Sequence, residues 1–435
     1  MSKTDNTAAL VESFEQIRDT LPGGWLSDIR SCAIESFEEQ GFPTQRTEAW
    51  KYTNLNRLTR YGFDPAAVIN VPDVSQWTSL FVDAADRIVV ANGMYNSEAS
   101  EIGNLPNGAS IVPLSEAVED TAPELEEQIS KIAPSEDAPF VALNTAFMRD
   151  GVVLKLEAGV QLERPLQVVH LVDPGDRTPA VHPRTLIVAG DNCSATVVET
   201  FCGAPGAAYW TNAVTEIRVG NNASVSHFKR QGESVGAYHT ALTQVRLSRC
   251  ARYRSVALGT GAVLSRNETR VAFEGEGADA SLAGGALLRG RQHADNTTEA
   301  DHTVRCTNSR QIFRNVLDDA SHSVFQGGVI VRQDAQKTDS SQSSRNLLLS
   351  EGAQADTKPE LQIFADDVKC AHGATVGDLD KDALFYLQSR GIPADQAKKL
   401  LIKSFISEIL GDLDDGPVNG HFADAVSDWL TEHKR

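Results

Sequence analysis

The chain has 435 residues, 41% hydrophobic and 23% charged, which is ordinary for a folded protein and long enough for two or three structural units. Forty Lys and Arg residues against 59 Asp and Glu residues give a net charge of −19. This negative charge repels phosphate backbones and anionic lipid headgroups, which argues against nucleic acid and membranes as partners. The six cysteines form no C-x-x-C pair, so we expect free thiols. The N-terminus has no apolar signal core, and no stretch approaches the roughly 18 apolar residues of a membrane span. We therefore expect a cytoplasmic protein.

Residues 1–65 are predicted to form an N-terminal helical segment. Its apolar residues recur at the three- and four-residue spacing of one helix face, at Leu26, Ile29, Ala33 and Phe37. Gly41 and Pro43 end this pattern, and the strap PTQRTEAWKYTNL follows. Residues 66–139 are rich in polar residues with only brief apolar runs such as RIVVA, and we expect a loosely structured linking segment there.

Residues 140–378 consist of short apolar segments rich in β-branched residues, separated by Gly, Asn and Asp. Equivalent turn positions recur in steps of 30, 28 and 27 residues, at Cys193, Ala223, Ala251 and Ala278. Such a period predicts a coil of stacked rungs, because each rung is too thin to bury its own apolar face. We therefore predict a mainly β protein with a parallel β-helix as its core. A β-sandwich with regular turns is the alternative.

Residues 379–435 are predicted to form a C-terminal helical subdomain. Asp380 is a candidate N-cap, and Gly391 and Gly411 are candidate helix ends. The apolar residues between Pro393 and Gly411 cover more than one narrow stripe, which indicates burial on two sides. These residues either pack against the neighbouring helix and the coil or form a docking face for another protein; the candidates for docking are Leu400, Leu401, Phe405, Ile406 and Ile409.

Motifs for catalysis are weak or absent. The sequence has no G-x-x-x-x-G-K-[ST] phosphate loop, no H-E-x-x-H and no G-x-G-x-x-G, so we predict that this chain binds no nucleotide by itself. GESVG at 232–236 matches G-x-S-x-G with Ser234 as candidate nucleophile and His239 nearby, but strand-like sequence follows where that elbow needs a helix. Histidines inside predicted strands are interpreted as packed residues rather than ligands: His170, His227, His302 and His322.

The segment KPELQIFADDVKCAHGATVG, residues 358–377, places a thiol close to an imidazole. In a short strand Val368, Cys370 and His372 share one face. Thiol and imidazole groups are ligands for iron or zinc, but two ligands are fewer than such sites need. Another chain or small thiols would have to supply the rest. On spacing alone, a structural role is favoured over a ligand role.

The block QKTDSSQSSRNLLLSEGAQADTKPELQIFADDVKCAHGATVG, residues 336–377, closely resembles the SufD branch of the SufB/SufD family, whose members are scaffold subunits of the SUF iron–sulfur cluster assembly system. The resemblance extends through PTQRTEAWKYTNL from residue 43, FVALNTAFMRDGVVLKL from 140 and ERPLQVVHLV from 163, and covers nearly all of the chain from about residue 40. The SufB branch shares the coil but would carry an acidic EHE-type segment where this chain has QIFADDVKCAHG.

This resemblance implies a right-handed parallel β-helix flanked by N-terminal and C-terminal helical segments. It also implies a complex with SufB and two copies of the ATPase SufC, in which the C-terminal helices meet SufC. In the family, the histidine of the C-x-H-G motif is implicated in building a nascent cluster at the SufB interface. That histidine falls on His372 and the motif's cysteine on Cys370. The family's Ser is Ala371 here, on the opposite face of the strand.

The resemblance therefore implies a non-enzymatic scaffold that carries a transient iron–sulfur cluster at the SufB interface. The isolated chain is a candidate for homodimer formation through its coil edge. Three alternatives remain: the SufB-type scaffold role, a stand-alone β-helix enzyme acting on polysaccharide, and a serine hydrolase using Ser234.

Overall fold

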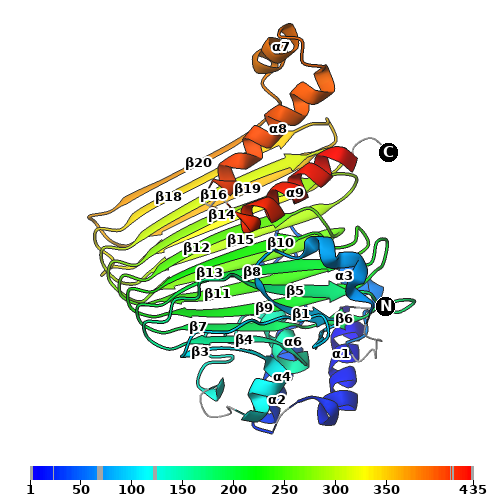
Figure 1. Ribbon diagram of the computed structural model, residues 1–435, viewed down its shortest axis with the longest axis vertical. Coiled ribbons are helices and arrows are strands. Elements are labelled where there is room, and N and C mark those ends of the chain that lie inside the picture. The colour runs from blue at the N-terminus through cyan, green and yellow to red at the C-terminus, as the bar shows by residue number, and fades with distance from the viewer. Residues whose placement is uncertain are drawn as a thin grey trace.

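The computed structural model describes residues 3–22, 24–65, 72–120, 125–411, 413 and 416–432. Of the segments predicted above, positions 1, 2, 23, 66–71, 121–124, 412, 414, 415 and 433–435 lie outside the described residues. Two large sheets face each other and form a parallel β-solenoid of about eight turns, with helices from both ends of the chain packed against it (Figure 1). The prediction of a mainly β protein built on a parallel β-helix is confirmed.

Each turn of the coil contributes one strand to each sheet, and all neighbouring strands are parallel except β1–β2 and β3–β4. The first sheet contains, in spatial order, β2 (Met94–Tyr95), β1 (Asp86–Ala91), β5 (Leu166–Val172), β8 (Ser194–Gly203), β10 (Ser224–Gln231), β12 (Arg252–Gly259), β14 (Asp279–Leu288), β16 (Asn308–Leu317), β18 (Asp339–Leu348) and β20 (Lys369–Gly377). The second sheet contains β19 (Gln354–Ile363), β17 (His322–Val331), β15 (His293–His302), β13 (Leu264–Phe273), β11 (Tyr238–Leu247), β9 (Trp210–Val219), β7 (Arg184–Ala189), β4 (Gly151–Leu156) and β3 (Ala109–Pro113), with β6 (Ala180–Val181) beside β9.

The strand register confirms the repeat that the sequence predicts. In the first sheet Ser194 pairs with Ser224, Ser224 with Arg252, and Arg252 with Asp279. Each of these residues directly follows one of the predicted turn positions, so the steps of 30, 28 and 27 residues recur in the register. Alternate side chains from both sheets meet inside the coil, which we call the lumen, and form its apolar core, as Val197, Val225, Ile217 and Val245 do.

A buried carboxylate lies within this lumen. Glu199 accepts hydrogen bonds from four side chains: His170 Nε2 (3.2 Å), His227 Nε2 (2.8 Å), Thr185 Oγ1 (2.9 Å) and Thr215 Oγ1 (3.0 Å). Burial alone would raise the pKa of Glu199, but the hydrogen bonds from the two histidines outweigh it and hold that pKa well below its usual range. The interpretation of His170 and His227 as packed residues is confirmed.

The C-terminal helices are α7 (Lys381–Ser389), α8 (Ala394–Leu410) and α9 (Pro417–Glu432). Asp380 caps α7 by accepting hydrogen bonds from the backbone of the first turn, as predicted, and α8 ends directly before Gly411. Helices α8 and α9 pack against the outer face of the first sheet through side chains such as Ile406 and Phe422. Figure 1 shows α7 projecting beyond the last turn of the coil, away from both sheets.

The N-terminal helices cover the other end of the coil. They are α1 (Lys3–Ile17), α2 (Leu26–Gln40), α3 (Asn56–Tyr61), α4 (Leu114–Asp120) and α6 (Pro139–Phe147), with short 3₁₀ turns at Arg18–Thr20, Glu48–Trp50 and Val74–Leu80. The predicted apolar face of α2 is buried at Leu26, Ala33 and Phe37. It packs together with α4, α6 and the outer face of the second sheet. Within the described ranges, no helix combines the length and apolarity needed to cross a lipid bilayer.

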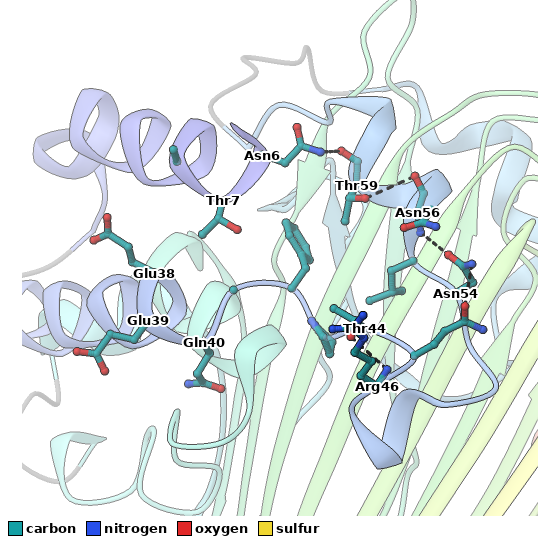
Figure 2. Close-up of a pocket in the computed structure, with 16 residues that line it drawn as sticks. Asn6, Thr7, Glu38, Glu39, Gln40, Thr44, Arg46, Asn54, Asn56 and Thr59 are labelled. Atoms are coloured by element: carbon teal, nitrogen blue, oxygen red, sulfur yellow. Dashed lines mark hydrogen bonds between the residues drawn. The ribbon is translucent and has the colours of Figure 1, made fainter. Parts of the chain in front are cut away.

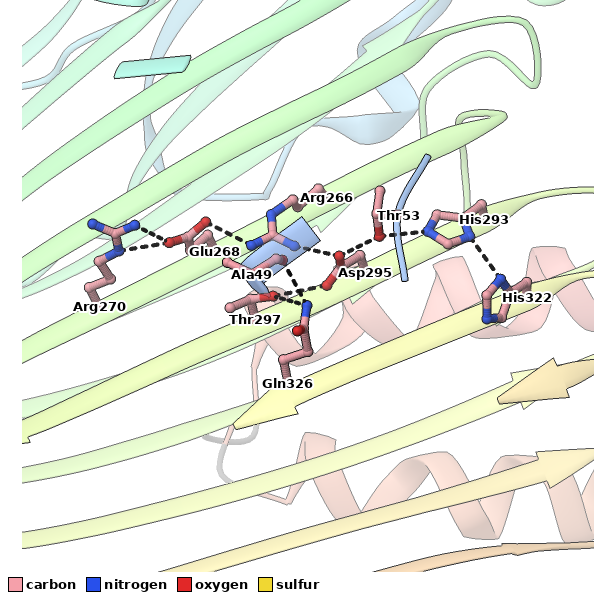
Figure 3. A network of polar contacts seen from close by, with 10 residues as sticks. All are labelled: Ala49, Thr53, Arg266, Glu268, Arg270, His293, Asp295, Thr297, His322 and Gln326. Carbon is pink, nitrogen blue, oxygen red and sulfur yellow. Dashed lines mark hydrogen bonds and ion pairs between the residues drawn. The ribbon is translucent and has the colours of Figure 1, made fainter. Parts of the chain in front are cut away.

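The strap formed by residues 43–55 packs on the outer face of the second sheet (Figure 3). The Trp50 ring lies over the Arg266 guanidinium, with 4.1 Å between its carbon and the ring centroid. Thr53 donates a hydrogen bond to Asp295, and Arg266 pairs with the same carboxylate. The strap also reaches the last strands of this sheet, because Gln326 on β17 donates to Ala49 O and Lys358 on β19 pairs with Glu48.

The interval 66–139, which we expected to be a loosely structured link, contributes strands in its described part. β1 pairs in parallel with β5, and β3 pairs with β4. The sheets therefore begin before residue 140. The run RIVVA is short and flanked by polar loops, so its sequence signal is weak although its last three residues are almost completely buried.

Candidate functional site

The coil ends at β19 and β20, and each of these strands has a paired neighbour on one side only among the described strands. In a parallel sheet, successive residues direct their backbone N–H and C=O groups to opposite neighbours. Lys369 N donates to Thr338 O, so the odd-numbered residues of β20 face β18. The backbone groups of Cys370, His372 and Ala374 therefore point away from the coil, toward the open edge.

The second open edge is interrupted. On β19 the N–H of Gln354 donates to Ser321 and that of Phe364 donates to Val331, so the even-numbered residues face β17. The outward positions include Pro359, which has no N–H to donate. Proline at an outward position of an edge strand blocks a continuous ladder with another chain. Of the two edges, β20 therefore offers the unbroken row of outward donors.

Cys370 and His372 both lie on the lumenal face of β20. Cys370 is in register with Ser340 and His372 with Gln342, and both β18 residues are buried in the lumen. Cys370 is half-buried and packs against the lumenal core, together with Val368. The His372 side chain is exposed, because no further turn of the coil covers β20.

The Cys370 thiol lies in a place that disfavours its ionised form. Burial raises the pKa of Cys370, and the nearby Asp339 carboxylate raises it further, against a backbone hydrogen bond from Ser340 that lowers it. The thiolate is the species that attacks electrophiles and binds metals. Cys370 in the isolated chain is therefore a weaker donor than a free thiol, whereas the exposed imidazole of His372 is accessible.

Alkylation should report this difference. At pH 7.5 we expect iodoacetamide to modify Cys370 several-fold more slowly than the exposed Cys306. Because the pKa of Cys370 is raised, its modification rate should keep rising at a pH above the pKa of an ordinary thiol. Peptide mass spectrometry after timed quenching measures both rates in one sample, with Cys250 as a second exposed reference. Faster modification of Cys370 than of the exposed thiols would contradict the assignment.

The two side chains do not form a complete metal site by themselves. In the part of the chain that the structure describes, no three His, Cys, Asp or Glu side chains converge on a common metal position. An iron or zinc centre usually takes three or four protein ligands. Cys370 and His372 are therefore at most half of such a ligand set, at an edge that a second chain can reach.

The candidate docking residues on α8 differ in exposure. Ile406 and Ile409 are fully buried against the chain's own first sheet, and Phe405 is partly buried there. Leu401 is half-buried, whereas Leu400 is 50% exposed. Only the Leu400 side of this group is therefore open to another protein.

Two aromatic residues that the sequence analysis did not single out extend this exposed surface. On α7, Phe385 is 72% and Tyr386 57% exposed. A groove of about 830 Å³ lies between the C-terminal helices and the last turns of the coil, lined by residues that include Leu349, Leu384 and Lys399. The sequence does contain a signal for this surface, namely two adjacent aromatic residues on a short predicted helix. Clustered apolar side chains that remain exposed often mark interaction sites.

The serine-hydrolase hypothesis finds no supporting geometry. Ser234 is buried in the turn between β10 and β11, so no helix follows the candidate nucleophile. Its Oγ accepts a hydrogen bond from Gly236 N (3.1 Å), and His239 Nδ1 lies 2.8 Å from Glu233 instead. The nucleophile elbow that the motif requires is therefore not formed.

A second large groove lies at the N-terminal end of the molecule. It measures about 980 Å³ and lies between α1, the end of α2 and the strap (Figure 2). Its 16 lining residues include Glu38, Arg46 and Asn54 but no His, Cys or Ser. The described residues of this groove therefore supply neither the thiol nor the imidazole groups that a ligand site for iron needs, and its polar lining consists of Glu, Gln, Asn, Thr and Arg side chains.

Comparison with known proteins agrees with this architecture. Residues 172–405 match the domain described as "SUF system FeS cluster assembly, SufBD core domain", and residues 4–168 match the "SufBD protein N-terminal region". An iron–sulfur cluster assembly SufBD family protein of Synechocystis sp. is 33% identical over 418 residues, which cover 92% of this chain and 90% of the relative.

Two further relatives are named iron–sulfur cluster assembly protein SufD. The one from Escherichia coli is 30% identical over 381 residues and 86% of either chain, and the one from Bacillus subtilis is 28% identical over 412 residues and 91% of either chain. Together the two domain matches span residues 4–405 with a gap of a few residues. The chain belongs to the SufBD family of SUF iron–sulfur cluster assembly proteins.

Proposed function

We propose that this chain is a SufD-type, non-enzymatic scaffold subunit that builds a nascent iron–sulfur cluster with a SufB-type partner at the open end of its coil. The observation that carries this proposal is the position of His372 and Cys370, an incomplete ligand pair on the lumenal face of a strand whose outer edge is open. Two ligands from one chain hold a cluster too weakly for storage. A site that two subunits complete can assemble a cluster and release it, which suits a donor.

The SufB-type partner is proposed to pair with β20. An extended segment that adds to a free sheet edge forms main-chain hydrogen bonds along its length. The outward N–H and C=O groups of Cys370, His372 and Ala374 provide that ladder, and pairing there places the partner's ligands beside His372. When SufB is absent, the same edge is free to pair with a second copy of this chain.

The SufC-type ATPase is proposed to dock on α7 and the exposed side of α8. Phe385, Tyr386 and Leu400 are the exposed apolar residues there, and a protein partner is the occupant that covers such a surface. This ATPase, two copies of which are expected in the complex, supplies the nucleotide site whose motif the chain lacks. We place the complex in the cytoplasm, where thiols such as the six free cysteines here stay reduced.

Replacing Ala374 with Pro should separate partner binding from folding. The Ala374 N–H faces outward, so A374P removes a donor from the open edge without removing a bond to β18. When an affinity-tagged chain is co-expressed with SufB-type and SufC-type proteins, we expect A374P to lose SufB but retain SufC. The partners recovered are identified and quantified by mass spectrometry.

The reciprocal control is Leu400→Asp, which places a charge on the proposed SufC surface. L400D should retain SufB and lose SufC, because Leu400 is half-exposed and lies on α8, whose main contacts with the sheet are to β14 and β16. Thermal unfolding of both variants checks that the coil is intact. Wild-type recovery of SufB by a folded A374P would contradict strand pairing at β20.

A further inference from the structure

Gln342 is a buried amide in the last complete part of the lumen, one strand away from His372. Its side chain is 3% exposed, and its Nε2 donates to Gln311 Oε1 at 3.3 Å. Its Oε1 is buried and has no hydrogen-bond partner. A buried acceptor without a partner is rare in folded proteins and is unfavourable by about 1–3 kcal/mol. An unpaired oxygen at this position therefore calls for a ligand or a neighbouring donor.

Neighbouring contacts fix the orientation of the amide. Gln311 Nε2 donates to Gly328 O (3.5 Å), which leaves Gln311 Oε1 facing Gln342. That oxygen also accepts the Thr298 hydroxyl at 2.6 Å. Rotating the Gln342 amide by half a turn would bring two carbonyl oxygens together. The nitrogen of Gln342 therefore faces Gln311, and its oxygen remains the unused group.

The next side chain along the sheet is His372. Gln342 and His372 are directly in register on β18 and β20, and side chains in register on one face lie about 5 Å apart at their bases. Among the described residues, no hydrogen bond or ion pair involves the His372 ring. An imidazole N–H in this position is therefore an available donor for the unused oxygen of Gln342.

We infer that Gln342 is a positioning residue for His372: its side-chain oxygen accepts one imidazole N–H and fixes the tautomer that leaves the other ring nitrogen unprotonated toward the open edge. A neutral amide acceptor orients the ring without adding a negative charge. Metal-binding histidines usually donate their second N–H to such a group, and its loss typically weakens metal binding or activity about 10–100-fold. This inference rests on the proposed ligand role of His372 and assigns it a lumenal partner.

The tautomer can be measured in the isolated full-length chain. With ¹⁵N-labelled histidine, and H372A to assign the signal, we expect wild-type His372 to show one dominant tautomer at pH 8. Q342M has a similar shape but no acceptor and should shift His372 to the mixed tautomers of free imidazole. Ser344→Ala is the matched control, because Ser344 is an equally buried lumenal residue with an unpartnered hydroxyl, in register with Ala374.

A tautomer mixture in the wild-type chain, or a Q342M signal like that of wild type, would overturn the inference. The wild-type measurement alone decides the matter if Q342M does not fold. Cluster yield on the reconstituted complex separates this inference from the proposed function. A fall of about tenfold with Q342M but not with S344A supports both. If H372A leaves the cluster yield unchanged while Q342M shifts the tautomer of His372, His372 has no role in cluster assembly. The hydrogen bond between Gln342 and His372 would still stand.

Discussion

Replacing Glu199 with Ala is expected to lower the free energy of unfolding by about 3–5 kcal/mol, the range for removing one partner of a buried charge-assisted cluster. The variant leaves four buried donors without an acceptor: His170, His227, Thr185 and Thr215. It also opens a cavity where both sheets meet. Denaturant unfolding followed by circular dichroism measures the loss, and hydrogen exchange should show it concentrated in β8 and β10.

Glu199→Gln is the matched control for this experiment. It keeps the shape of the side chain and one acceptor oxygen. If its NH₂ group faces His170, that ring can move its proton to Nδ1, which has no partner, and accept through Nε2. We therefore expect E199Q to lose less than half as much stability as E199A. Equal losses would mean that the charge, rather than the number of acceptors, stabilises the cluster.

The free energy of unfolding of the wild-type chain and of E199Q should depend differently on pH in the acid range. The folded-state pKa of Glu199 is depressed below its ordinary value of 4.5, so the resulting stabilisation is present above that pH. It is lost as the pH falls from about 4.5 through the depressed folded-state value. The stability of the wild-type chain should therefore fall more steeply below pH 4.5 than that of E199Q. Parallel acid profiles would contradict the assignment of a charged, hydrogen-bonded Glu199.

The sequence predicts the coil because its period repeats in the turns. The four turn positions are all small and buried, and each follows a residue with positive φ: Cys193, Ala223, Ala251 and Ala278. Their residue types therefore report the spacing of the rungs directly. The first strands are harder to find, because β1 is a short run between polar loops and pairs with β5, about 80 residues later. The local sequence pattern indicates that β1 is a strand, but it does not identify the distant strand with which β1 pairs.

The candidate site is predictable only in part for the same reason. Alternation along one strand places Cys370 with Val368 on the lumenal side, and the half-site follows from the number of ligands. Amphipathic spacing on α8 cannot tell the buried Ile406 from the exposed Leu400, because it identifies apolar faces without saying which neighbour covers each. The open edge of β20 and the partner of Gln342 depend on register between strands about 30 residues apart.

Replacing His372 with Ala should abolish most cluster assembly while leaving the protein folded. His372 is exposed at the open end of the coil, so H372A is expected to leave the coil folded, at a cost of no more than the about 1–3 kcal/mol of an unpartnered Gln342 oxygen. Its imidazole is the accessible donor of the half-site, because the Cys370 thiol is held in its protonated form. C370S should therefore reduce cluster yield less than H372A does.

The most direct measurement is the cluster content of the reconstituted complex with wild-type, H372A and C370S chains, assayed as iron and acid-labile sulfide per complex and by visible absorbance. Equal recovery of SufB-type and SufC-type partners is the control that the complex forms. We expect the H372A complex to assemble normally and to lose about tenfold or more of its cluster yield. A wild-type yield from a fully assembled H372A complex would contradict it.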